Sequence, residues 1–438
     1  MVRPHFSGIS RLLVAVSLVL LTASCKSNKE RLADYVEPDN PEVEKFKIKP
    51  LEGYRVARYS DLFSSVVSVP LETTNESLVG EITKLEILGN GDFLIFDRIK
   101  SAILLFAPNG KFIRRIGRQG SGPEEYTSLD DVCYDSYNNQ IILLDNSKGC
   151  FMRYSVDGQM VSQTKTGMFI GSFAVLDKDN LVVYLDYHDS SSNPADWYNF
   201  KVIDKAGKVK AKFLKYDKRT SFLHSCDNVF CSLDGKIYSK QEFSSSVFSV
   251  SLDKFYPKYY FDFGKNQIPT KWITEDFDNI ADKIRKSNGK TYLSKVFFVK
   301  GKMMMNLVHN HVYYLYSLNQ NDCKSDVYAS DMINDMGLGS SIMISNVKGN
   351  KCYFAIDASR FYDMKTDIVK YKAGDNITKK DEGKITAALK KLGNKDPSTR
   401  LFLEEYMKSD IILTQRDIDM VNSIKEGDNP IIQVCTLK

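Results

Sequence analysis

Hydrophobic positions along the chain gather in short runs that are separated by polar turns. Two segments show this best: "GDFLIFDRIKSAILLFAPNGKFIRRI" from Gly91 and "NQIILLDNSKGCFMRYSVDGQMVSQ" from Asn139. Each holds an apolar strand ending in an aspartate, a polar turn, a second strand, a tight turn and a third strand. Asn-Gly or Asp-Gly occupies the tight turn, where both central residues need a positive φ. The segments predict repeated β-hairpin units, offset by 48 residues from Asp97 to Asp145.

Four later segments continue the pattern with more variation, and they begin at Asn180, Gly235, Gly301 and Gly349. Six candidate units of roughly 40 to 50 residues, each with three or four strands, match the period of propeller blades. A single unit cannot bury both of its faces, whereas units packed radially cover one another. We therefore predict an all-β fold, a six-bladed β-propeller over residues 51–438.

The ring of units needs a closing contact, because an open ring leaves sheet edges unpaired. The terminal stretch "NPIIQVCTLK" from Asn429 lies far along the sequence from the sixth unit. We predict that it pairs with "SSVVSVPLET", residues 64–73, near the other end of the propeller.

Two parts of the chain break the strand pattern and predict inserted helices. In "TEDFDNIADKIRKSNG", Phe277, Ile280 and Ile284 have helical spacing, with Thr274 as N-cap, so a helix is expected within about 272–289. Residues 380–426 predict two short helices broken near Pro397 and a third in "TQRDIDMVNSIKEG". We expect these to decorate the rim of the last unit.

The N-terminus "MVRPHFSGISRLLVAVSLVLLTASC" has a basic start, a short apolar run, small residues and then Cys25. The apolar run is too short to span a bilayer comfortably, which favours a secretory signal. The pattern resembles a bacterial lipoprotein signal, with residues 1–24 as signal peptide and Cys25 as the lipid attachment site. An ordinary cleaved signal with an incidental cysteine is the alternative. Lys26, rather than an aspartate, favours the outer membrane, and residues 25–50 are expected to form a flexible tether.

Composition narrows the function classes only slightly. The formal charge of +5 is spread along the chain and gives little reason to expect nucleic-acid binding. The other seven cysteines form no CxxC pair, so a zinc site has no support. Most of them are expected to be buried thiols, although Cys226 and Cys231 are close enough in sequence to form a disulfide.

A glycine cluster in "IGRQGSGPEEY", Ile116 to Tyr126, invites a comparison with phosphate-binding loops. It lacks the Gly-Lys-Ser/Thr ending of such a loop, and strand-type units flank it on both sides. We interpret it as a connection between two units, in which glycine permits backbone angles that other residues avoid.

No catalytic constellation, metal site or cofactor motif is predicted. His309 and His311 would face the same side of a strand, but no third ligand is close in sequence. No Ser-His-Asp pattern or nucleophile elbow is present. We therefore predict no catalytic residues, no metal ligands and no cofactor.

The candidate binding residues lie in a long insert, "DYHDSSSNPADWYN", from Asp186 to Asn199. A polar loop on a rigid scaffold is a common position for binding residues. Aromatic faces beside carboxylates and amides would suit a sugar or a peptide. The candidates are Tyr187, His188, Asp189, Trp197 and Tyr198. The alternative is an ordinary long hairpin whose aromatic residues pack on the blade.

Three stretches, "VPLETTNESLVGEITKLEI", "FAPNGKFIRRIGRQGSGPEEY" and "YSVDGQMV", carry a family resemblance. They resemble a family of bacterial lipoproteins with a six-bladed β-propeller, related in design to NHL-repeat propellers. The terminal "NPIIQVCTLK" is similar to that family's ending. The resemblance implies the fold and the export route but little biochemistry, because propellers host binders, scaffolds and enzymes alike.

Three functions are compatible with the sequence. The first is a non-enzymatic, lipid-anchored module of the cell envelope that binds a protein, peptide or carbohydrate. The second is a lyase or hydrolase whose His, Asp or Glu residues converge in the central channel of the propeller. The third is a scaffold subunit of an envelope complex. In each case the membrane is a partner through the lipid anchor, and nucleic acid is not.

Overall fold

The computed structural model describes residues 42–48, 55–220, 229–233, 235–275, 277–287, 289–322, 324–392 and 397–438. The predicted signal peptide, Cys25 and Cys226 lie outside these residues. No helix among the described residues is long and apolar enough to cross a membrane.

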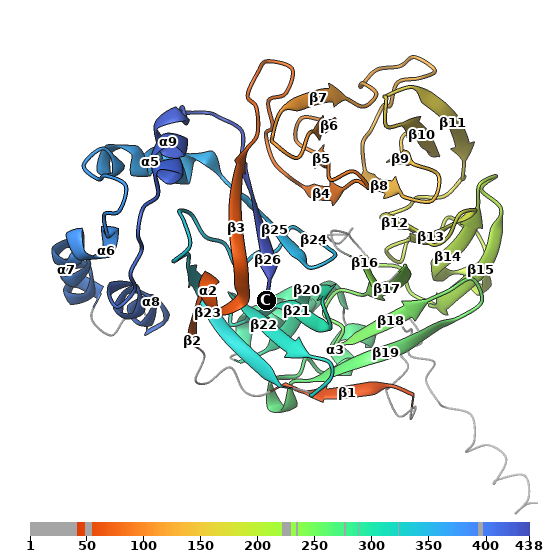
Figure 1. Cartoon of the computed structure of the whole chain (residues 1–438). Coiled ribbons are helices and arrows are strands. Elements are labelled where there is room, and N and C mark those ends of the chain that lie inside the picture. Colours follow the sequence, from red (N-terminus) through yellow and green to blue (C-terminus); the bar gives the residue numbers. More distant parts are fainter. Residues whose placement is uncertain are drawn as a thin grey trace, which may run out of the picture.

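Six mainly antiparallel sheets stand side by side in a ring, as Figure 1 shows. The first three follow one another along the chain, each with four strands. Sheet 1 contains β4 (Lys84–Ile87), β5 (Phe93–Asp97), β6 (Ala102–Phe106) and β7 (Phe112–Arg115). Sheet 2 contains β8 (Asp131–Asp135), β9 (Gln140–Asp145), β10 (Cys150–Ser155) and β11 (Met160–Lys165). Sheet 3 contains β12 (Ser172–Val175), β13 (Asn180–Tyr184), β14 (Tyr198–Asp204) and β15 (Val209–Lys215).

The other three sheets also take strands from the N-terminal part of the chain. Sheet 4 contains β16 (Phe230–Leu233), β17 (Lys236–Lys240), β18 (Ser246–Val250), β19 (Phe255–Asp262) and β1 (Glu44–Lys47). Sheet 5 contains β20 (Thr291–Val299), β21 (Lys302–His309), β22 (Val312–Asn319), β23 (Ser325–Ile333) and β2 (Arg55–Arg58). Sheet 6 contains β24 (Asn346–Lys348), β25 (Lys351–Ile356), β26 (Ile431–Leu437) and β3 (Phe63–Pro70).

Every neighbouring pair of sheets shares a hydrophobic cluster, and this holds the ring together. Phe96 of sheet 1 and Leu143 of sheet 2 belong to one such cluster. The pair that closes the ring is built in the same way, with Ile432 of sheet 6 and Ile95 of sheet 1 in a common cluster. The middle strands are therefore buried on both faces, so β5 and β6 read as continuous apolar runs without alternation. The arrangement is consistent with a propeller.

The repeated aspartates of the first two units have a structural explanation. Asp97 and Asp145 are the last residues of the second strand in their sheets, and both are fully buried. The Asp97 carboxylate accepts hydrogen bonds from the backbone N–H of Gly80 at 2.6 Å and of Lys100 at 3.0 Å. Asp145 accepts equivalent bonds from Thr127 and Lys148. Each aspartate thus ties the connection before its sheet to the turn that follows the second strand.

Strand β26 closes the ring as the sequence predicted. It lies between β25 and β3, with Ile431 opposite Pro70 and Val434 opposite Val67. Just before it, the buried Asn429 side chain accepts a hydrogen bond from Val79 N and donates to the carbonyls of Glu72 and Ser77. The two ends of the propeller are joined by these contacts.

Residues 44–47 fall within the segment predicted to be a flexible tether, yet they form a strand. β1 runs parallel to β19, and β2 runs parallel to β23 in the next sheet. Both strands cover the outer edge of a sheet, which protects backbone groups that would otherwise invite pairing with another chain.

The first helical insert differs in detail from the prediction. Two short helices, α3 (Thr270–Glu275) and α4 (Ile280–Lys286), flank the 3-10 turn η3 (Phe277–Asn279). Thr274 lies inside α3 and is not an N-cap. Ile273 of α3 and Ile280 and Ile284 of α4 pack into one hydrophobic cluster with Ile268.

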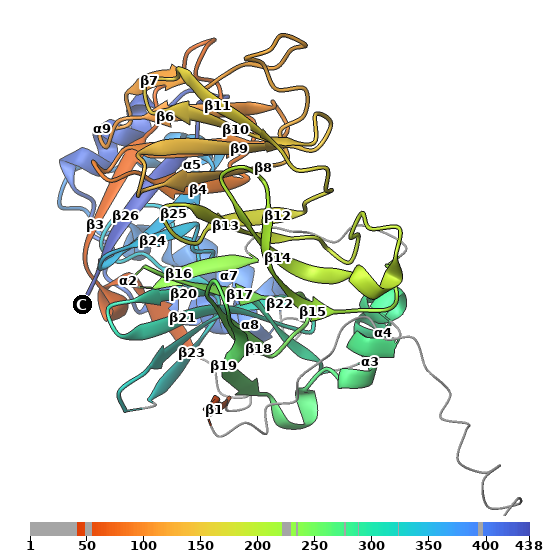
Figure 2. The ribbon, with the colours of Figure 1, turned by 90° about the vertical axis from the view of Figure 1, so that its right-hand side faces the viewer.

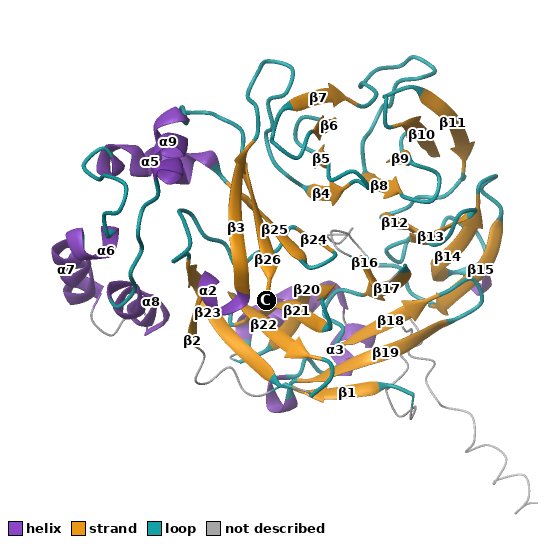
Figure 3. Ribbon diagram, in the orientation of Figure 1, coloured by secondary structure: helices purple, strands orange, loops and turns teal. Residues whose placement is uncertain are grey.

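The second helical insert lies between β25 and β26 and stands beside sheet 6 (Figure 3). The predicted break before Pro397 is confirmed by α7 (Glu382–Leu392) and α8 (Pro397–Met407). The third predicted helix is α9 (Gln415–Ser423), capped by Thr414. Not predicted were α5 (Ala358–Ile368), where the sequence was interpreted as part of the sixth unit, and α6 (Ile377–Lys380). The remaining short elements are α2 (Tyr59–Leu62), η1 (Pro194–Asp196) and η2 (Gly264–Asn266).

The glycine cluster at 116–126 connects β7 of sheet 1 with β8 of sheet 2, as predicted. The Arg118 guanidinium lies 2.6 Å from Glu125 Oε1, and the same carboxylate accepts from Gly122 N at 2.8 Å. The hydrogen bond from Gly122 is the main cause of the lowered pKa of Glu125, and the charge of Arg118 lowers this pKa further. Gly117 has a φ of 60° and lies against the Tyr154 ring, where a side chain would be crowded. The charged residues of this loop bind the loop itself.

Candidate binding site

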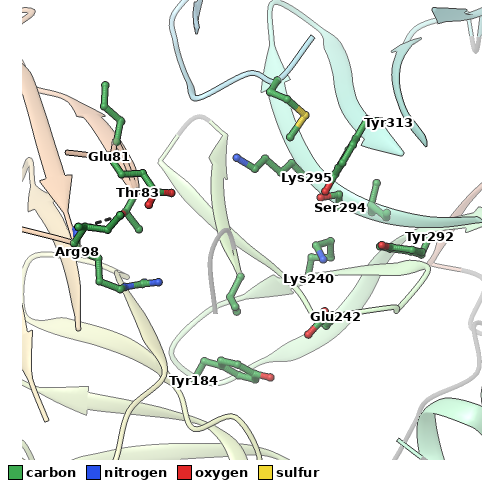
Figure 4. A pocket seen from close by; sticks show the side chains of 15 residues that line it. Glu81, Thr83, Arg98, Tyr184, Lys240, Glu242, Tyr292, Ser294, Lys295 and Tyr313 are labelled. Carbon is green, nitrogen blue, oxygen red and sulfur yellow. Dashed lines mark hydrogen bonds between the residues drawn. The ribbon is translucent and has the colours of Figure 1, made fainter. Parts of the chain in front are cut away.

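A cavity of about 510 Å³ opens at the centre of the ring, and we call it the Lys240 cavity (Figure 4). Its walls come from sheets 1, 3, 4 and 5 and from the segment before β24. Its polar lining consists of Glu81, Thr83, Arg98, Tyr184, Lys240, Glu242, Tyr292, Ser294, Lys295 and Tyr313. A volume of this size suits a small-molecule ligand.

Two cationic side chains reach into the Lys240 cavity from opposite walls (Figure 4). Arg98 comes from the turn after β5 and is exposed, whereas Lys295 comes from β20 and is half-buried. Three tyrosines add aromatic surface. Tyr184 is buried, Tyr292 packs against Phe243 with ring centroids 5.2 Å apart, and Tyr313 is 42% exposed.

Lys240 is the most unusual residue of the cavity. It is the last residue of β17, the strand position that Asp97 and Asp145 hold in sheets 1 and 2. Its side chain is only 7% exposed. In the described part of the chain, its ammonium has one hydrogen-bond acceptor, the Gln241 carbonyl at 3.5 Å, and no ion pair. Burial lowers the pKa of Lys240 to about 8, a shift that nearby Glu242 opposes only partly.

A second cavity of about 520 Å³ adjoins the first, and Val229 lines both. We call it the Lys84 cavity. The ammonium of Lys84 lies 3.1 Å from Asp131 Oδ1, donates to Val132 O at 2.7 Å and lies 3.7 Å from Glu86 Oε1. Burial alone would lower the pKa of Lys84, but Asp131 and Glu86 together raise it above its ordinary value. The charge of Lys84 is therefore matched by the protein itself.

The predicted binding loop is folded onto itself at several points. Asp189 is buried, and its Oδ2 lies 2.7 Å from the Lys201 ammonium and accepts from Tyr198 N at 3.1 Å. His188 is half-buried, and its Nδ1 contacts the Asp186 carbonyl. Tyr187 is buried as well.

The other two predicted residues lie farther along the same loop. Trp197 stacks on Tyr216 with centroids 5.7 Å apart, carries the Arg219 guanidinium 4.3 Å from its ring centre, and donates to Ser191 O. Tyr198 is half-buried beneath Lys212. None of the five predicted residues lines either of the two cavities. The loop, η1 and helices α3 and α4 project together from one side of the ring (Figure 2).

The loop nevertheless supports the Lys240 cavity from behind. Tyr184, which lines the cavity, donates to Asp186 Oδ1 at 2.9 Å. The Tyr187 hydroxyl donates to Gln241 Oε1 at 2.6 Å, and Gln241 stands between Lys240 and Glu242. Asp186 and Tyr187 both have positive φ values, 47° and 60°, which non-glycine residues adopt only when their surroundings hold them.

The two strand histidines do not share one face as predicted. His309 ends β21, but Asn310 and His311 form the hairpin turn, with positive φ values of 48° and 64°. His309 Nδ1 contacts Thr291 Oγ1 at 2.8 Å, and burial lowers the pKa of His309. Among the described residues, no group of three His, Cys, Asp or Glu side chains is placed to hold a metal ion.

The described cysteines carry no disulfide. Cys150, Cys352 and Cys435 are buried, as expected, whereas Cys133 and Cys231 are half-buried. Cys352 and Cys435 lie opposite each other on β25 and β26. The predicted candidate pair of Cys226 and Cys231 includes one residue outside the described part.

The sequence did not point to Arg98, Lys240 or Lys295, because they come from three different sheets. One signal was present in the repeat pattern. The fourth unit, "GKIYSK" from Gly235, ends its first strand in a lysine where the first two units end in an aspartate. A change of charge at a buried position of a repeat marks a candidate site.

Six sheets in a ring around a polar cavity define a propeller-like β protein. The chain belongs to the family described as "Domain of unknown function (DUF4934)", whose model matches residues 48–397. No curated protein matches the sequence.

Several solved structures are similar to this chain. A Bacteroides fragilis protein inferred to be exported is 16% identical, with a TM-score of 0.68, over 90% of this chain and 99% of that chain. A DUF4221 family member from Bacteroides vulgatus (12% identity, TM-score 0.39) covers 68% of this chain and 84% of its own. Virginiamycin B lyase from Staphylococcus aureus (8% identity, TM-score 0.35) covers 66% of this chain and 81% of its own. The first likeness supports the fold, and the other two are too distant to bear on function.

Proposed function

We propose that the protein is a lipid-anchored, six-bladed β-propeller of the cell envelope that binds a small polar ligand in the Lys240 cavity without chemically converting it. The observation that carries the proposal is the convergence of Arg98, Lys240 and Lys295 from three sheets on one cavity. Cavities of a few hundred Å³ with a few converging polar groups are the usual form of small-ligand sites.

The N-terminal sequence supports the proposed location. The basic start, the short apolar run and the small residues before Cys25 support export and lipid attachment at that cysteine. Several acyl chains on one residue would hold the protein stably at the outer membrane, since each buried CH₂ contributes about 0.8 kcal/mol. Similarity to the Bacteroides fragilis protein agrees with export.

The anchor is tested by metabolic labelling of the full chain with an alkyne fatty acid. The wild-type chain should be labelled and found in the membrane fraction, whereas Cys25→Ala should be unlabelled. Labelling that persists in Cys25→Ala would refute attachment at this residue.

The binding site is tested by screening the full-length, detergent-solubilised chain against saccharide and peptide arrays. The double variant Arg98→Ala/Lys295→Ala should lose the captured ligand. The matched control Lys178→Ala/Lys210→Ala removes two exposed lysines that line neither cavity, and it should bind normally. Equal binding by both double variants would exclude the cavity. Conversion of the ligand into a product would instead support the lyase or hydrolase hypothesis.

A further inference from the structure

We propose that the ligand of the Lys240 cavity is a sugar acid whose carboxylate pairs with the Lys240 ammonium. The inference rests on the proposed function and names the chemistry of its ligand. Lys240 is buried beside the cavity, and among the described residues its ammonium has no ion pair.

Lys240 occupies a strand position that carries an aspartate in two other sheets. In sheets 1 and 2 this position holds Asp97 and Asp145, whose carboxylates accept backbone N–H bonds and need no counterion. An ammonium can only donate, so lysine cannot replace the aspartate in that role. Sheet 4 therefore holds a buried charge at this position that cannot accept the backbone bonds made in sheets 1 and 2.

The surroundings of the Lys240 ammonium are energetically unfavourable. A buried ammonium is costly unless it is paired and hydrogen-bonded. Lys240 is only 7% exposed, and within the described part of the chain its one acceptor is the Gln241 carbonyl at 3.5 Å, near the limit of a hydrogen bond. A ligand carboxylate placed in the cavity would supply both the missing charge and strong acceptors.

The other residues that line the Lys240 cavity suit the remaining part of such a ligand. Tyr184, Tyr292 and Tyr313 give the cavity amphipathic aromatic walls, and Ser294 and Thr83 add hydroxyl groups. Aromatic rings with polar tips suit a ligand that has one apolar face and many hydroxyls. Arg98 and Lys295 lie nearer to solvent and would attract an anion toward the buried lysine. A sugar ring with a carboxylate matches this combination better than an acidic peptide, which makes less use of the tyrosine faces.

The pairing also predicts that a proton is taken up on binding. The charged and titratable groups around Lys240 are Glu242 on its own segment, Cys231 on β16, and Tyr184, Tyr292, Arg98 and Lys295 across the cavity. In this structure the pKa of Lys240 is about 8. A bound carboxylate raises it, because an adjacent negative charge favours the ammonium. Above pH 8, binding should therefore take up a proton, and affinity should fall as the pH rises.

The experiment is titration calorimetry of the full-length protein with digalacturonate and with its dimethyl ester. The acid should bind about tenfold to a hundredfold more tightly than the neutral ester, as expected of a desolvated charge pair. Lys240→Met should abolish this difference, whereas the exposed control Lys210→Met should preserve it. At pH 9, heats measured in buffers of different ionisation enthalpy should report proton uptake by the wild-type chain.

Several outcomes would overturn the inference while sparing the proposed function. These are ester binding as tight as acid binding, a preference for the acid that survives in Lys240→Met, and binding at pH 9 without proton uptake. A neutral saccharide that binds and depends on Arg98 and Lys295 would leave the cavity as a site but remove the carboxylate. Binding only of an acidic peptide or of inorganic phosphate, or no binding of digalacturonate, glucuronate or N-acetylneuraminate, would also overturn it. The wild-type proton measurement decides the matter even if Lys240→Met fails to fold.

Discussion

Lys84 and Lys240 are two lysines that border adjoining cavities at the centre of the same ring, and their surroundings differ. The ammonium of Lys84 is clamped by Asp131, Val132 O and Glu86, so its charge is balanced by the fold. In the part of the chain that the structure describes, the ammonium of Lys240 has one long contact, to the Gln241 carbonyl. A lysine near the centre of the ring is therefore not by itself evidence of a binding site. A buried charge that is paired within the protein, such as Lys84, stabilises the fold. A buried charge without an ion pair among the described residues, such as Lys240, is a candidate for pairing with a ligand.

Asp131 explains why the Lys84 side belongs to the framework. Besides Lys84 of sheet 1, its carboxylate accepts hydrogen bonds from Ser172 Oγ at 2.8 Å and from Phe173 N at 3.2 Å, both in sheet 3. One buried residue of sheet 2 therefore links three consecutive sheets. The Lys240 side has no comparable link through its lysine among the described residues.

The largest effect is expected for Lys84→Met, which should lower the free energy of unfolding by about 2–3 kcal/mol. The change leaves Asp131 buried without its cation, and broken buried pairs cost roughly 3–5 kcal/mol when fully enclosed. The Lys84 side chain is 31% exposed, which reduces the loss. Chemical denaturation followed by circular dichroism would measure it. A loss under 1 kcal/mol would show that the clamp is not structural.

The matched substitution Lys240→Met should have the opposite sign and raise the free energy of unfolding by about 1–2 kcal/mol at pH 7. Methionine fills a similar volume without the buried charge, and replacing poorly compensated buried ions with apolar side chains is often stabilising. The same denaturation assay applies. Destabilisation as large as that of Lys84→Met would mean that the two lysines do not differ as described.

The pH dependence of the free energy of unfolding should differ between the wild type and Lys240→Met. The pKa of Lys240 is about 8 in the folded chain, against an ordinary 10.5 in the unfolded chain. The unfolded chain therefore binds more protons in this window, so the cost of burying Lys240 is fully present below pH 8 and fades as the pH rises toward 10.5. The wild type should gain about 2–3 kcal/mol relative to Lys240→Met across this window. Parallel pH profiles for the two chains would contradict the assignment.

The smallest effect is expected at the support behind the cavity. Tyr187→Phe removes the hydrogen bond to Gln241 and should cost about 1 kcal/mol of stability and a few-fold in digalacturonate affinity. Tyr137→Phe, at an exposed tyrosine that lines neither cavity, serves as control and should change neither quantity. Equal effects in both variants would mean that the Tyr187 hydrogen bond to Gln241 is not the cause.

Much of the fold could be predicted from the sequence because its signals are local or repeated. Asp97, Asp145 and the Asn-Gly and Asp-Gly turns recur at one offset, and β26 is an apolar run without a neighbour in its own unit. The α5 helix was missed because it directly follows the strand of the sixth unit, with no glycine or proline between them.

The candidate site could not be predicted, because its parts meet only through the ring. Arg98, Lys240 and Lys295 lie in different units, and each alone resembles an ordinary surface charge. The insert at 186–199 drew attention through its aromatic residues, yet the structure uses Tyr187 and Asp189 inside the loop. Whether Trp197 or Tyr198 binds a ligand stays a prediction.

The pairing of β3 with β26, which closes the ring, is also expected to form late in folding. Ser64 and Thr436, which contact each other across this pair, are 372 residues apart in sequence. Contacts of such separation form slowly, and intermediates that wait for them expose apolar surface and unpaired edges. If the chain is exported, β3 enters the new compartment long before its partner does. A chain stalled during translocation would therefore present an open edge to chaperones and proteases, so cells could distinguish complete from incomplete molecules before any ligand is bound.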